Sequence, residues 1–391
     1  MPNSATPIAP RKTRPRPARL PAIAVYALTR RGAALARGLA RDLAETGYAP
    51  TLHLPRRLAE EFGGHYFGTL REALTSRFNA FSGHVVVAAT GLVVRIIAPL
   101  LASKTGDPAV VVLPQDGRFA VSLLSGHLGG GNQLAPAAAR ATGGQAVIST
   151  ATDIEGQPAL EMLARDHGLA VEDLSRLAYF SRSLVEGDRV RVSDPGGFLV
   201  PHLGPWPDSF ELGEPSASRP PLAAASTSTG PDISESGEPS ASPKVLVDYR
   251  LVPAGPLDLV LRPKVLFLGL GCHRGVDQDE LAELIDGQLL SHQLAKEAVA
   301  ALATVETRAE EPALISLCRK NNWLLLTFTK AELGRVKAPN PSKTVNKNIG
   351  VDSVCEAAAL LAARTDRLVI TKVKSRRATL AAAVGGRPKA P

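Results

Sequence analysis

Short aliphatic runs alternate with Ala- and Leu-rich stretches along most of the chain, and this alternation constrains the fold more than any other feature. Strands are predicted at residues 22–28, 50–54, 85–89, 110–113, 119–124, 145–150, 265–270, 303–307, 323–328 and 368–373. Helices are predicted at residues 33–46, 92–102, 277–290, 310–321 and 354–364. The pattern indicates an α/β fold with open, mostly parallel sheets. Aromatic residues make up only 4% of the chain, which suits layers packed from Val, Leu, Ile and Ala.

One segment of low complexity divides the chain. Residues 205–244 are rich in Pro, Ser, Ala, Gly and Glu and repeat Gly-Glu-Pro-Ser-Ala-Ser at 213–218 and 237–242. Such a segment buries too little apolar surface to offset its ordering entropy, so we predict a disordered insert. The length of 391 residues suggests two or three α/β domains. The expected parts are a disordered basic tail (1–20), an N-terminal α/β body (21–204), the insert (205–244), a C-terminal α/β domain (245–384) and a disordered end (385–391).

The positive charge is concentrated at the N-terminus. The net charge is +8, and five basic residues without an acid stand before residue 21, namely Arg11, Lys12, Arg14, Arg16 and Arg19. Their Pro/Ala-rich setting favours a solubilising arm over a nucleic-acid-binding arm. Scarce aromatic residues also disfavour a protein that stacks on bases. The remaining excess of three charges fits a small polyanionic substrate.

Cysteine usage and hydropathy indicate a cytoplasmic protein. Cys272, Cys318 and Cys355 are odd in number and lack the spacing of zinc ligands. No signal peptide follows the basic N-terminus, and no apolar run reaches membrane-spanning length. We therefore expect free thiols, a cytoplasmic location and no membrane partner.

The stretch Ser-Gly-His-Leu-Gly-Gly-Gly-Asn at residues 125–132 is predicted to be a strand-to-helix loop. Glycines let backbone N–H groups converge on an anionic oxygen, and a helix N-terminus adds a favourable dipole. His127 supplies a group that titrates near neutrality. The alternative is a plain glycine turn with a solvated histidine. Pro136, shortly afterwards, must occupy the first turn of the helix or kink it.

Three loops are predicted to share one edge of the N-terminal sheet, because ligands of open α/β sheets bind outside the carboxyl ends of the strands. These loops contain residues 90–91, 125–132 and 150–153. Asp116-Gly117 predicts a hairpin between two of the strands. Nearby, Lys104 is placed to bind a carboxylate, and Pro108 is expected to hold Asp107 near the same edge. The alternatives are an exposed helix-end charge for Lys104 and a turn cap for Asp107.

A second glycine loop, Gly-Cys-His-Arg-Gly at residues 271–275, follows the first strand of the C-terminal body. It lacks the dinucleotide-binding G-x-G-x-x-G spacing, because Arg274 stands at the third glycine position. Free amides and one cation suit an anionic substituent. Cys272 beside His273 suggests a nucleophile, but an apolar cysteine is favoured. The strand at 368–373 is expected to be the last, followed by the basic residues Lys374, Arg376 and Arg377.

Several blocks of the sequence, in order, resemble the CbiG family of cobalamin-biosynthesis proteins, the cobalt-precorrin-5A hydrolases. They are residues 91–99, 103–104, 107–112, 122–130, 269–275 and 350–360, together with Lys372. Two separate bodies that match in order give a more specific signal than any one motif. The resemblance covers nearly everything except the tail, the insert and the final residues.

The resemblance implies an enzyme of anaerobic corrin-ring biosynthesis. Such an enzyme opens the lactone of cobalt-precorrin-5A and expels acetaldehyde to give cobalt-precorrin-5B. Its substrate is a cobalt-bearing tetrapyrrole edged with acetate and propionate groups. The cobalt arrives within the substrate, so no cofactor and no metal site of the protein's own are expected.

Residue chemistry suggests roles within these motifs. His127 is the candidate base, Ser125 and the amides of residues 129–131 are candidate oxyanion donors, and Asp107 is expected to orient the histidine or act as a second acid or base. Arg95, Lys104 and Arg274 are expected to clamp carboxylates. The other expected substrate contacts are motif members, namely Gly91, Gly126, Gly129, Gly130, Asn132, Gly271, Ser353, Glu356 and Lys372.

Two other classes of protein remain open from the sequence. One is a non-catalytic tetrapyrrole carrier or a partner of other enzymes in the pathway. If the insert is a flexible tether, the C-terminal body binds substrate or a neighbouring enzyme without completing the site. The other is a nucleic-acid binder that uses the basic tail. The oligomeric state is not predicted.

Overall fold

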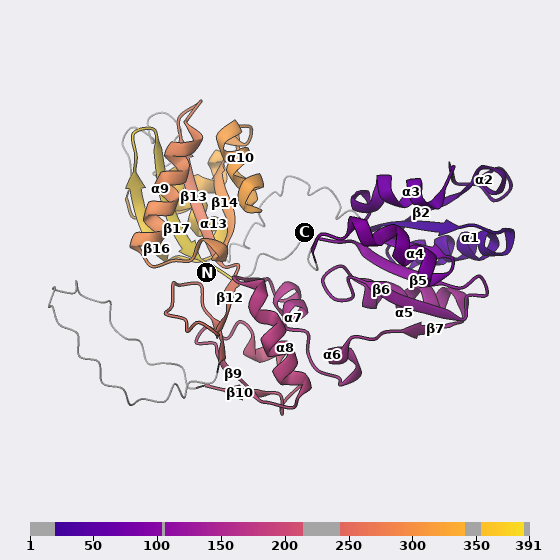
Figure 1. Cartoon of the computed structure of the whole chain (residues 1–391). Helices are drawn as coiled ribbons and strands as arrows, with labels where there is room; N and C mark the ends of the chain where they lie inside the picture. The colour runs from indigo at the N-terminus through magenta and orange to yellow at the C-terminus, as the bar shows by residue number, and fades with distance from the viewer. Residues whose placement is uncertain (1–19, 104–105, 214–242, 341–352, 387–391) are drawn as a thin grey trace, which may run out of the picture. The chain divides into compact units, whose positions relative to one another are not determined.

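A computed structural model describes residues 20–103, 106–213, 243–340 and 353–386 (Figure 1). Contacts divide these residues into two compact units. The N-terminal unit contains the described residues up to 162 together with 184–187, and the C-terminal unit contains the rest. One sheet lies in the first unit and two lie in the second, so the predicted α/β class with mostly parallel sheets is confirmed. No helix in the described part of the chain is long and apolar enough to cross a membrane.

The N-terminal unit is a seven-stranded sheet of order β3-β2-β1-β4-β5-β6-β7, with helices on both faces. Its strands are β1 (Ala22–Ala27), β2 (Ala49–Pro55), β3 (His65–Phe67), β4 (Gly83–Val87), β5 (Ala109–Leu113), β6 (Phe119–Leu124) and β7 (Gln145–Val147). Its helices are α1 (Arg30–Glu45), α2 (Arg56–Phe62), α3 (Leu70–Arg77), α4 (Thr90–Ile97), α5 (Gly131–Thr142) and α6 (Ala151–Ile154). Helices α1 and α5 pack on one face, and α3 and α4 on the other (Figure 1).

The last two strands of this sheet reverse its direction. Strands β1 to β5 are parallel to one another, whereas β6 pairs antiparallel with β5, and β7 is parallel to β6. The loop after β6 therefore leaves at the edge where β4 and β5 begin. The predicted common edge is wrong for residues 90–91, which follow β4 at the opposite edge. The hairpin predicted at Asp116-Gly117 is confirmed, and it is the physical reason for this reversal.

The second sheet, of order β10-β9-β11-β12-β8, is built from both sides of the low-complexity segment. Its strands are β8 (Leu169–Val171), β9 (Val190–Ser193), β10 (Phe210–Leu212), β11 (Lys244–Val247) and β12 (Leu259–Pro263), and α7 (Leu160–Asp166) and α8 (Leu177–Val185) accompany them. Strand β11 pairs with β9 and β12.

The division of the chain thus differs from the one expected. Residues 163–183 and 188–204 belong with the C-terminal unit, not with an N-terminal body of 21–204. The segment 205–244 lies between strands of one sheet, and its two ends form β10 and the start of β11. Composition marks where a loop is long, but strand pairing decides which parts fold together. The remaining predictions of disorder concern residues 1–19, 214–242 and 387–391, which lie outside the described residues.

The third sheet has the order β15-β14-β13-β17-β16. Its strands are β13 (Leu266–Cys272), β14 (Val299–Val305), β15 (Leu324–Phe328), β16 (Leu368–Lys374) and β17 (Ala378–Val384), with helices α9 (Gln278–Ser291), α10 (Pro312–Asn321), α11 (Lys330–Gly334) and α13 (Val354–Ala363). The strand at 368–373 was expected to be the last strand, and this expectation is wrong. The Ala-rich strand β17 follows it and pairs antiparallel with β13 along seven residues.

Candidate functional site

The glycine loop after β6 is held by hydrogen bonds within itself. The amide of Gly130 donates to the carbonyl of His127 at 2.9 Å, and the amide of Gly131 donates to the carbonyl of Ser125 at 2.9 Å. Ser125 adopts a left-handed conformation with a φ of 54°, which the tight turn requires. The amides of residues 129–131 were expected to face an anion, and for Gly130 and Gly131 this expectation is wrong, because each amide already has a backbone acceptor.

Helix α5 begins at Gly131 and contains Pro136 as an interior residue. The proline therefore does not occupy the first turn. It lacks the N–H that would bond the carbonyl of Asn132 four residues earlier. The amide of Asn132 itself donates to the carbonyl of Gly126 at 2.8 Å. The start of the helix thus closes the loop and supplies a side chain, Asn132, to the site.

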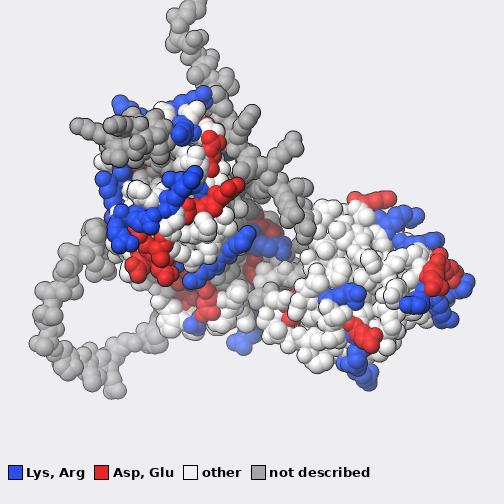
Figure 2. Space-filling model, turned by 90° about the horizontal axis from the view of Figure 1, so that it is seen from above, with Lys and Arg blue, Asp and Glu red and all other residues white. Residues whose placement is uncertain are grey.

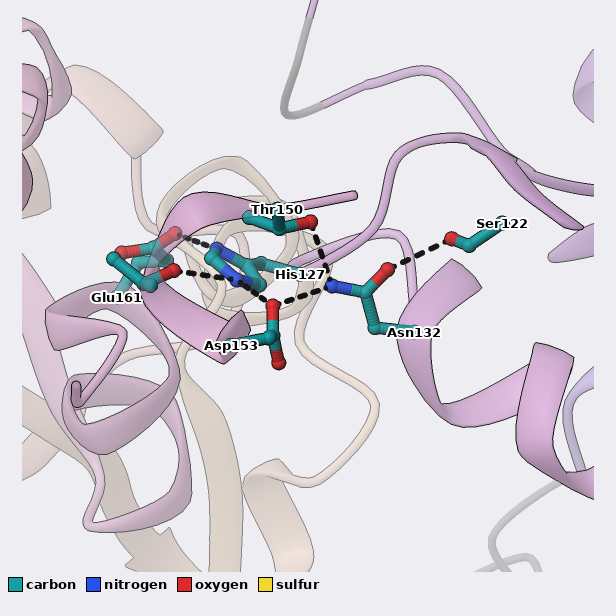
Figure 3. Close-up of polar contacts among 7 residues, drawn as sticks. Ser122, His127, Asn132, Thr150, Asp153 and Glu161 are labelled. Carbon is teal, nitrogen blue, oxygen red and sulfur yellow. Dashed lines mark hydrogen bonds and ion pairs between the residues drawn. The ribbon is translucent and has the colours of Figure 1, made fainter. Parts of the chain in front are cut away.

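His127 lies between two carboxylates (Figure 3). Its Nδ1 is 2.7 Å from Oε1 of Glu161, and its Nε2 is 3.0 Å from Oδ2 of Asp153. The hydroxyl of Thr152 lies 3.3 Å from the same Nε2. The imidazole is 19% exposed, so it stands at the surface of the site without being freely solvated.

These contacts favour the doubly protonated ring. The hydrogen bond to Glu161 raises the pKa of His127 above its ordinary value, against the effect of burial, and Asp153 raises it further. An imidazolium has two N–H donors and no lone pair. The predicted role of His127 as a base does not fit this arrangement, because both ring nitrogens already donate to acceptors.

Asn132 connects Asp153 to the sheet. Its Nδ2 donates to Oδ2 of Asp153 at 2.8 Å and to the hydroxyl of Thr150 at 3.0 Å, and its Oδ1 accepts from the hydroxyl of Ser122 at 2.7 Å (Figure 3). The contact with Ser122 fixes which end of the amide faces the carboxylate. Gly126 leaves room for this side chain, since a Cβ there would lie 2.7 Å from Oδ1 of Asn132. Of the motif members, Gly126 and Asn132 therefore do belong to the site.

Ser125 does not present its hydroxyl at the surface of the site. Its oxygen is buried and has no hydrogen-bond partner among the described residues. Gly129 packs directly against Ser125, where a Cβ would collide with the serine Cβ and lie 2.8 Å from its carbonyl oxygen. In this conformation Ser125 cannot act as the predicted oxyanion donor, and Gly129 serves the packing of the turn.

Asp107 has a different partner from the one expected. Both of its carboxylate oxygens accept from the amide of Ala102, at 3.0 and 3.2 Å, and the residue is only 7% exposed. It makes no contact with His127, so it does not orient the imidazole. It caps the backbone before β5, which corresponds to the turn-cap alternative.

The predicted carboxylate clamps of the N-terminal unit do not gather at His127. Gly91 and Arg95 lie on α4, at the opposite edge of the sheet, and Nη1 of Arg95 donates to the carbonyl of Gly91 at 3.0 Å. Lys104 lies outside the described residues. The edge that carries His127 is therefore formed by the loops after β6 and β7 and by the start of α7.

The loop after β13 is tied to neighbouring elements. The amide of Gly275 donates to Oε1 of Glu311 at 3.0 Å, and Nε of Arg308 donates to the carbonyl of Cys272 at 2.9 Å. The guanidinium of Arg377 donates to the carbonyls of Arg274 and Gly275 at 2.6 and 3.1 Å. The amide of Gly275 is thus already used, whereas the side chain of Arg274 is exposed.

Burial determines the protonation of Cys272, which lies in this loop, and of Cys318 on α10. It raises the pKa of both Cys272 and Cys318 to about 11, so both are thiols at neutral pH and the apolar interpretation fits. Gly271 makes room for a neighbour, since a Cβ there would lie 2.8 Å from the hydroxyl oxygen of Thr379.

Three further predicted substrate contacts, Ser353, Glu356 and Lys372, form a structural cluster. Glu356 is fully buried, and its carboxylate accepts from the amide and side chain of Asn340 at 3.0 and 2.7 Å and from the amide of Lys372 at 3.1 Å. Ser353 is buried at the N-cap of α13. Nζ of Lys372 donates to the carbonyl of Asn340 at 3.0 Å. Glu356 thus holds α13 to β16, and its carboxylate is buried and occupied by these donors.

Sequence reasoning placed Asp153 at the edge of the sheet but gave it no role, and it missed Glu161 altogether. The position of residues 150–153 directly after a predicted strand was a usable signal for Asp153. Nothing local marks Glu161, which lies 34 residues from His127 on α7 and contacts it only in the folded chain. In the described part of the chain, no group of three or more His, Cys, Asp or Glu side chains is placed to hold a metal ion.

Three family models match consecutive regions that together cover most of the chain. The model "Cobalamin synthesis G N-terminal" matches residues 72–153, "Cobalamin biosynthesis central region" matches 158–263, and "Cobalamin synthesis G C-terminus" matches 266–383. The first match ends at Asp153, and the second begins just before Glu161. The boundary between two family regions thus coincides with the site.

Curated relatives extend over nearly the whole chain. Cobalt-precorrin-5A hydrolase of Priestia megaterium is 30% identical over 92% of this chain and 94% of its own length. The protein of the same name from Salmonella typhimurium is 32% identical over 87% of this chain and 91% of its own. Protein CobE of a Sinorhizobium species is 32% identical over 30% of this chain and 79% of its own length. The resemblance of the motifs is thereby confirmed, and the chain belongs to the cobalamin biosynthesis protein G (CbiG) family.

Proposed function

We propose that this chain is a cobalt-precorrin-5A hydrolase, which opens the lactone of cobalt-precorrin-5A and releases acetaldehyde to give cobalt-precorrin-5B. The names of the two full-length relatives support the hydrolase activity and its substrate. The observation that carries the proposal is the cluster of His127, Asp153 and Glu161, whose members lie in two neighbouring regions that match the family. Groups that donate and accept protons, held at the surface by fixed neighbours, are what hydrolysis of an ester requires.

The substrate and the chain divide the chemistry between them. A cobalt tetrapyrrole brings its own metal, so we propose that the protein supplies no cofactor and no metal ligand set. Lactone hydrolysis needs a proton acceptor for water and a donor for the leaving oxygen. Loss of acetaldehyde then breaks a carbon–carbon bond, and the electron pair of that bond stays with the macrocycle. The protein has to bind the ring and place its lactone at the cluster.

Partners and location follow from the same proposal. The small-molecule partner is the cobalt tetrapyrrole, and enzymes that make it or use the product are candidate protein partners. We propose a cytoplasmic location, which the free thiols of Cys272, Cys318 and Cys355 support. On the face shown in Figure 2, basic side chains lie beside acidic ones, which does not favour a nucleic-acid partner on that face.

The decisive experiment is to incubate the purified full chain with cobalt-precorrin-5A and to measure acetaldehyde through the NADH consumed by alcohol dehydrogenase. We expect one acetaldehyde per macrocycle and multiple turnovers. A carrier would change the visible spectrum of the corrinoid on binding but release no acetaldehyde. Binding without release, over enzyme concentrations that saturate the ligand, would overturn the proposed activity and favour the carrier.

A further inference from the structure

Asp153 is the member of the cluster that keeps an oxygen for a ligand. Its Oδ2 accepts from Nε2 of His127 and from Nδ2 of Asn132, whereas Oδ1 has no partner among the described residues. The Asp153 side chain is 38% exposed, compared with 13% for Glu161. Figure 3 shows the second oxygen of Asp153 directed away from both the imidazole and the amide. The carboxylate is thus fixed on one side and open on the other.

The neighbours of Asp153 fix its orientation. Asn132 donates at 2.8 Å, and its amide is held by Ser122 and Thr150. The imidazolium of His127 adds a positive charge next to the same oxygen. Among the described residues, the titratable groups that face this pair are Asp153, His127 and Glu161, from α6, the glycine loop and α7. In the doubly protonated ring, Nδ1 donates to Glu161 and Nε2 donates to Asp153.

We propose that Asp153 is the proton acceptor of the lactone-opening step and that His127 is a positioning residue. This inference rests on the proposed function. Oδ1 of Asp153 takes a proton from a water molecule while the oxygen of that water bonds to the lactone carbonyl carbon. The bond between the carbonyl carbon and the ring oxygen then breaks, and the proton on Asp153 passes to that oxygen as it leaves. One water is consumed, and Asp153 returns to its ionised form.

The other members of the cluster fit this step less well. His127 has both nitrogens engaged with acceptors, so it would first have to lose a proton and a partner. Glu161 is less exposed and is occupied by the imidazole at 2.7 Å. Asp153 alone combines an exposed oxygen with a fixed one, which is the arrangement that a general base needs.

The first test is Asp153→Asn, with Glu155→Gln as the matched control. Asparagine keeps the size and a carbonyl oxygen for His127 and Asn132 but cannot take a proton at neutral pH. We expect kcat to fall about 100-fold to 10,000-fold, the range for loss of a general base, with KM changed less than about threefold. Glu155 is an exposed carboxylate two residues away, and its substitution is expected to leave kcat unchanged. More than about a tenth of the kcat remaining in Asp153→Asn would overturn the proposal.

A second variant protects the test against a folding defect. Asp153→Ala leaves a space beside Asn132 that formate can enter. We expect formate to restore part of the acetaldehyde release in Asp153→Ala and to have no effect on wild type or on Glu155→Gln. Equal effects of formate on all three proteins would contradict a chemical role for this carboxylate. The activity of the wild type is measured in parallel. An inactive wild type would contradict the proposed hydrolase activity, whereas an active wild type leaves only the role of Asp153 under test.

The pH profile of kcat/KM distinguishes a positioning role of His127 from a role as the base. In His127→Gln the positive charge beside Asp153 is gone, and no group at this position titrates near neutrality. The alkaline limb that reports loss of the imidazolium should disappear. Complete inactivity of His127→Gln at every pH, together with an active Asp153→Asn, would assign the base to His127 instead.

Discussion

The two glycine loops look alike in the sequence and are used differently. Each follows an apolar strand and precedes a helix, and each contains one histidine. In the loop after β6, the histidine and Asn132 turn their side chains to one carboxylate, which keeps an exposed oxygen. In the loop after β13, Arg308, Arg377 and Glu311 reach in and bond the loop's own backbone.

The difference shows what a glycine-rich turn does and does not establish. The glycines permit a tight reversal in both places. Whether such a turn becomes a site depends on the side chains of neighbouring elements, which either satisfy the backbone of the loop or leave polar atoms directed outward. In this protein the charged side chains around the second loop stabilise the turn, whereas the side chains around the first loop hold a carboxylate that keeps an exposed oxygen.

The largest difference in stability and activity between the two loops is expected for Gly129→Ala compared with Gly275→Ala. A Cβ at Gly129 would collide with the Cβ of Ser125 and press on the carbonyls of Ser125 and Asp107, at 2.8 and 3.2 Å. Because these are rigid atoms, we expect a loss of about 3 kcal/mol of stability. A displaced loop should also lower activity by about 100-fold. Thermal unfolding and acetaldehyde release measure the two effects.

Gly275→Ala is the matched control, since Gly275 has a φ of 62° but nothing within 4 Å of a Cβ. Only the left-handed backbone is penalised there, at about 1–2 kcal/mol. If the two variants lose the same stability and activity, the crowding around Gly129 does not distinguish the loops, and the comparison fails.

Acid should destabilise the N-terminal unit more than the C-terminal unit. Burial, followed by the charge of Arg77, lowers the pKa of His53 to about 4, and burial also lowers the pKa of His84. The pKa of His53 is lower in the folded state than in the unfolded state. The stability that the neutral imidazole provides is therefore complete above about pH 6.5 and is lost as the pH falls towards 4. The loss is on the order of 3 kcal/mol. In the C-terminal unit, no described histidine is buried.

His53→Phe tests this contrast. The ring of His53 stacks on the ring of Tyr26, with 5.1 Å between the ring centroids. Phenylalanine keeps an aromatic ring there without a titratable nitrogen. We expect hydrogen exchange in β1, β2 and β4 to accelerate at pH 4.5 in the wild type and much less in the variant. Equal acceleration in both proteins would show that His53 does not cause the acid sensitivity.

Much of the fold could be predicted because it depends on local patterns. The strand at β1, the antiparallel hairpin of β5 and β6, and the helix capped by Asp277 all appear where composition and turn residues indicated them. The segment 56–77 was missed, since two short helices and a three-residue strand leave little periodicity. The Ala-rich strand β17 was missed because alanine carries no strand preference.

The site was harder to predict because it depends on direction and distance. His127 was found through its loop, but the edge on which it lies follows from the reversal at Asp116-Gly117, whose consequence for residues 90–91 was not drawn. Asp107 was assigned to the histidine because Pro108 was expected to hold it near the same edge of the sheet, while its carboxylate accepts from the amide of Ala102. Glu161 joins from a different family region. Contacts between side chains far apart in sequence leave no local signal.

The smallest expected effect concerns Arg274, the one basic side chain of the second loop that the sequence assigned to the substrate. Its side chain is exposed, and its guanidinium has no partner among the described residues, so Arg274→Ala should leave the melting temperature unchanged. An exposed pair with a substrate carboxylate contributes about 0.4–1 kcal/mol, which corresponds to a rise in KM of about twofold to fivefold with kcat unaltered. Arg377→Ala is the contrast, because it removes two bonds to loop carbonyls and should lower the melting temperature. An unchanged KM in Arg274→Ala would mean that the loop after β13 only stabilises its own unit, and the two glycine loops would then differ in kind, one reactive and one structural.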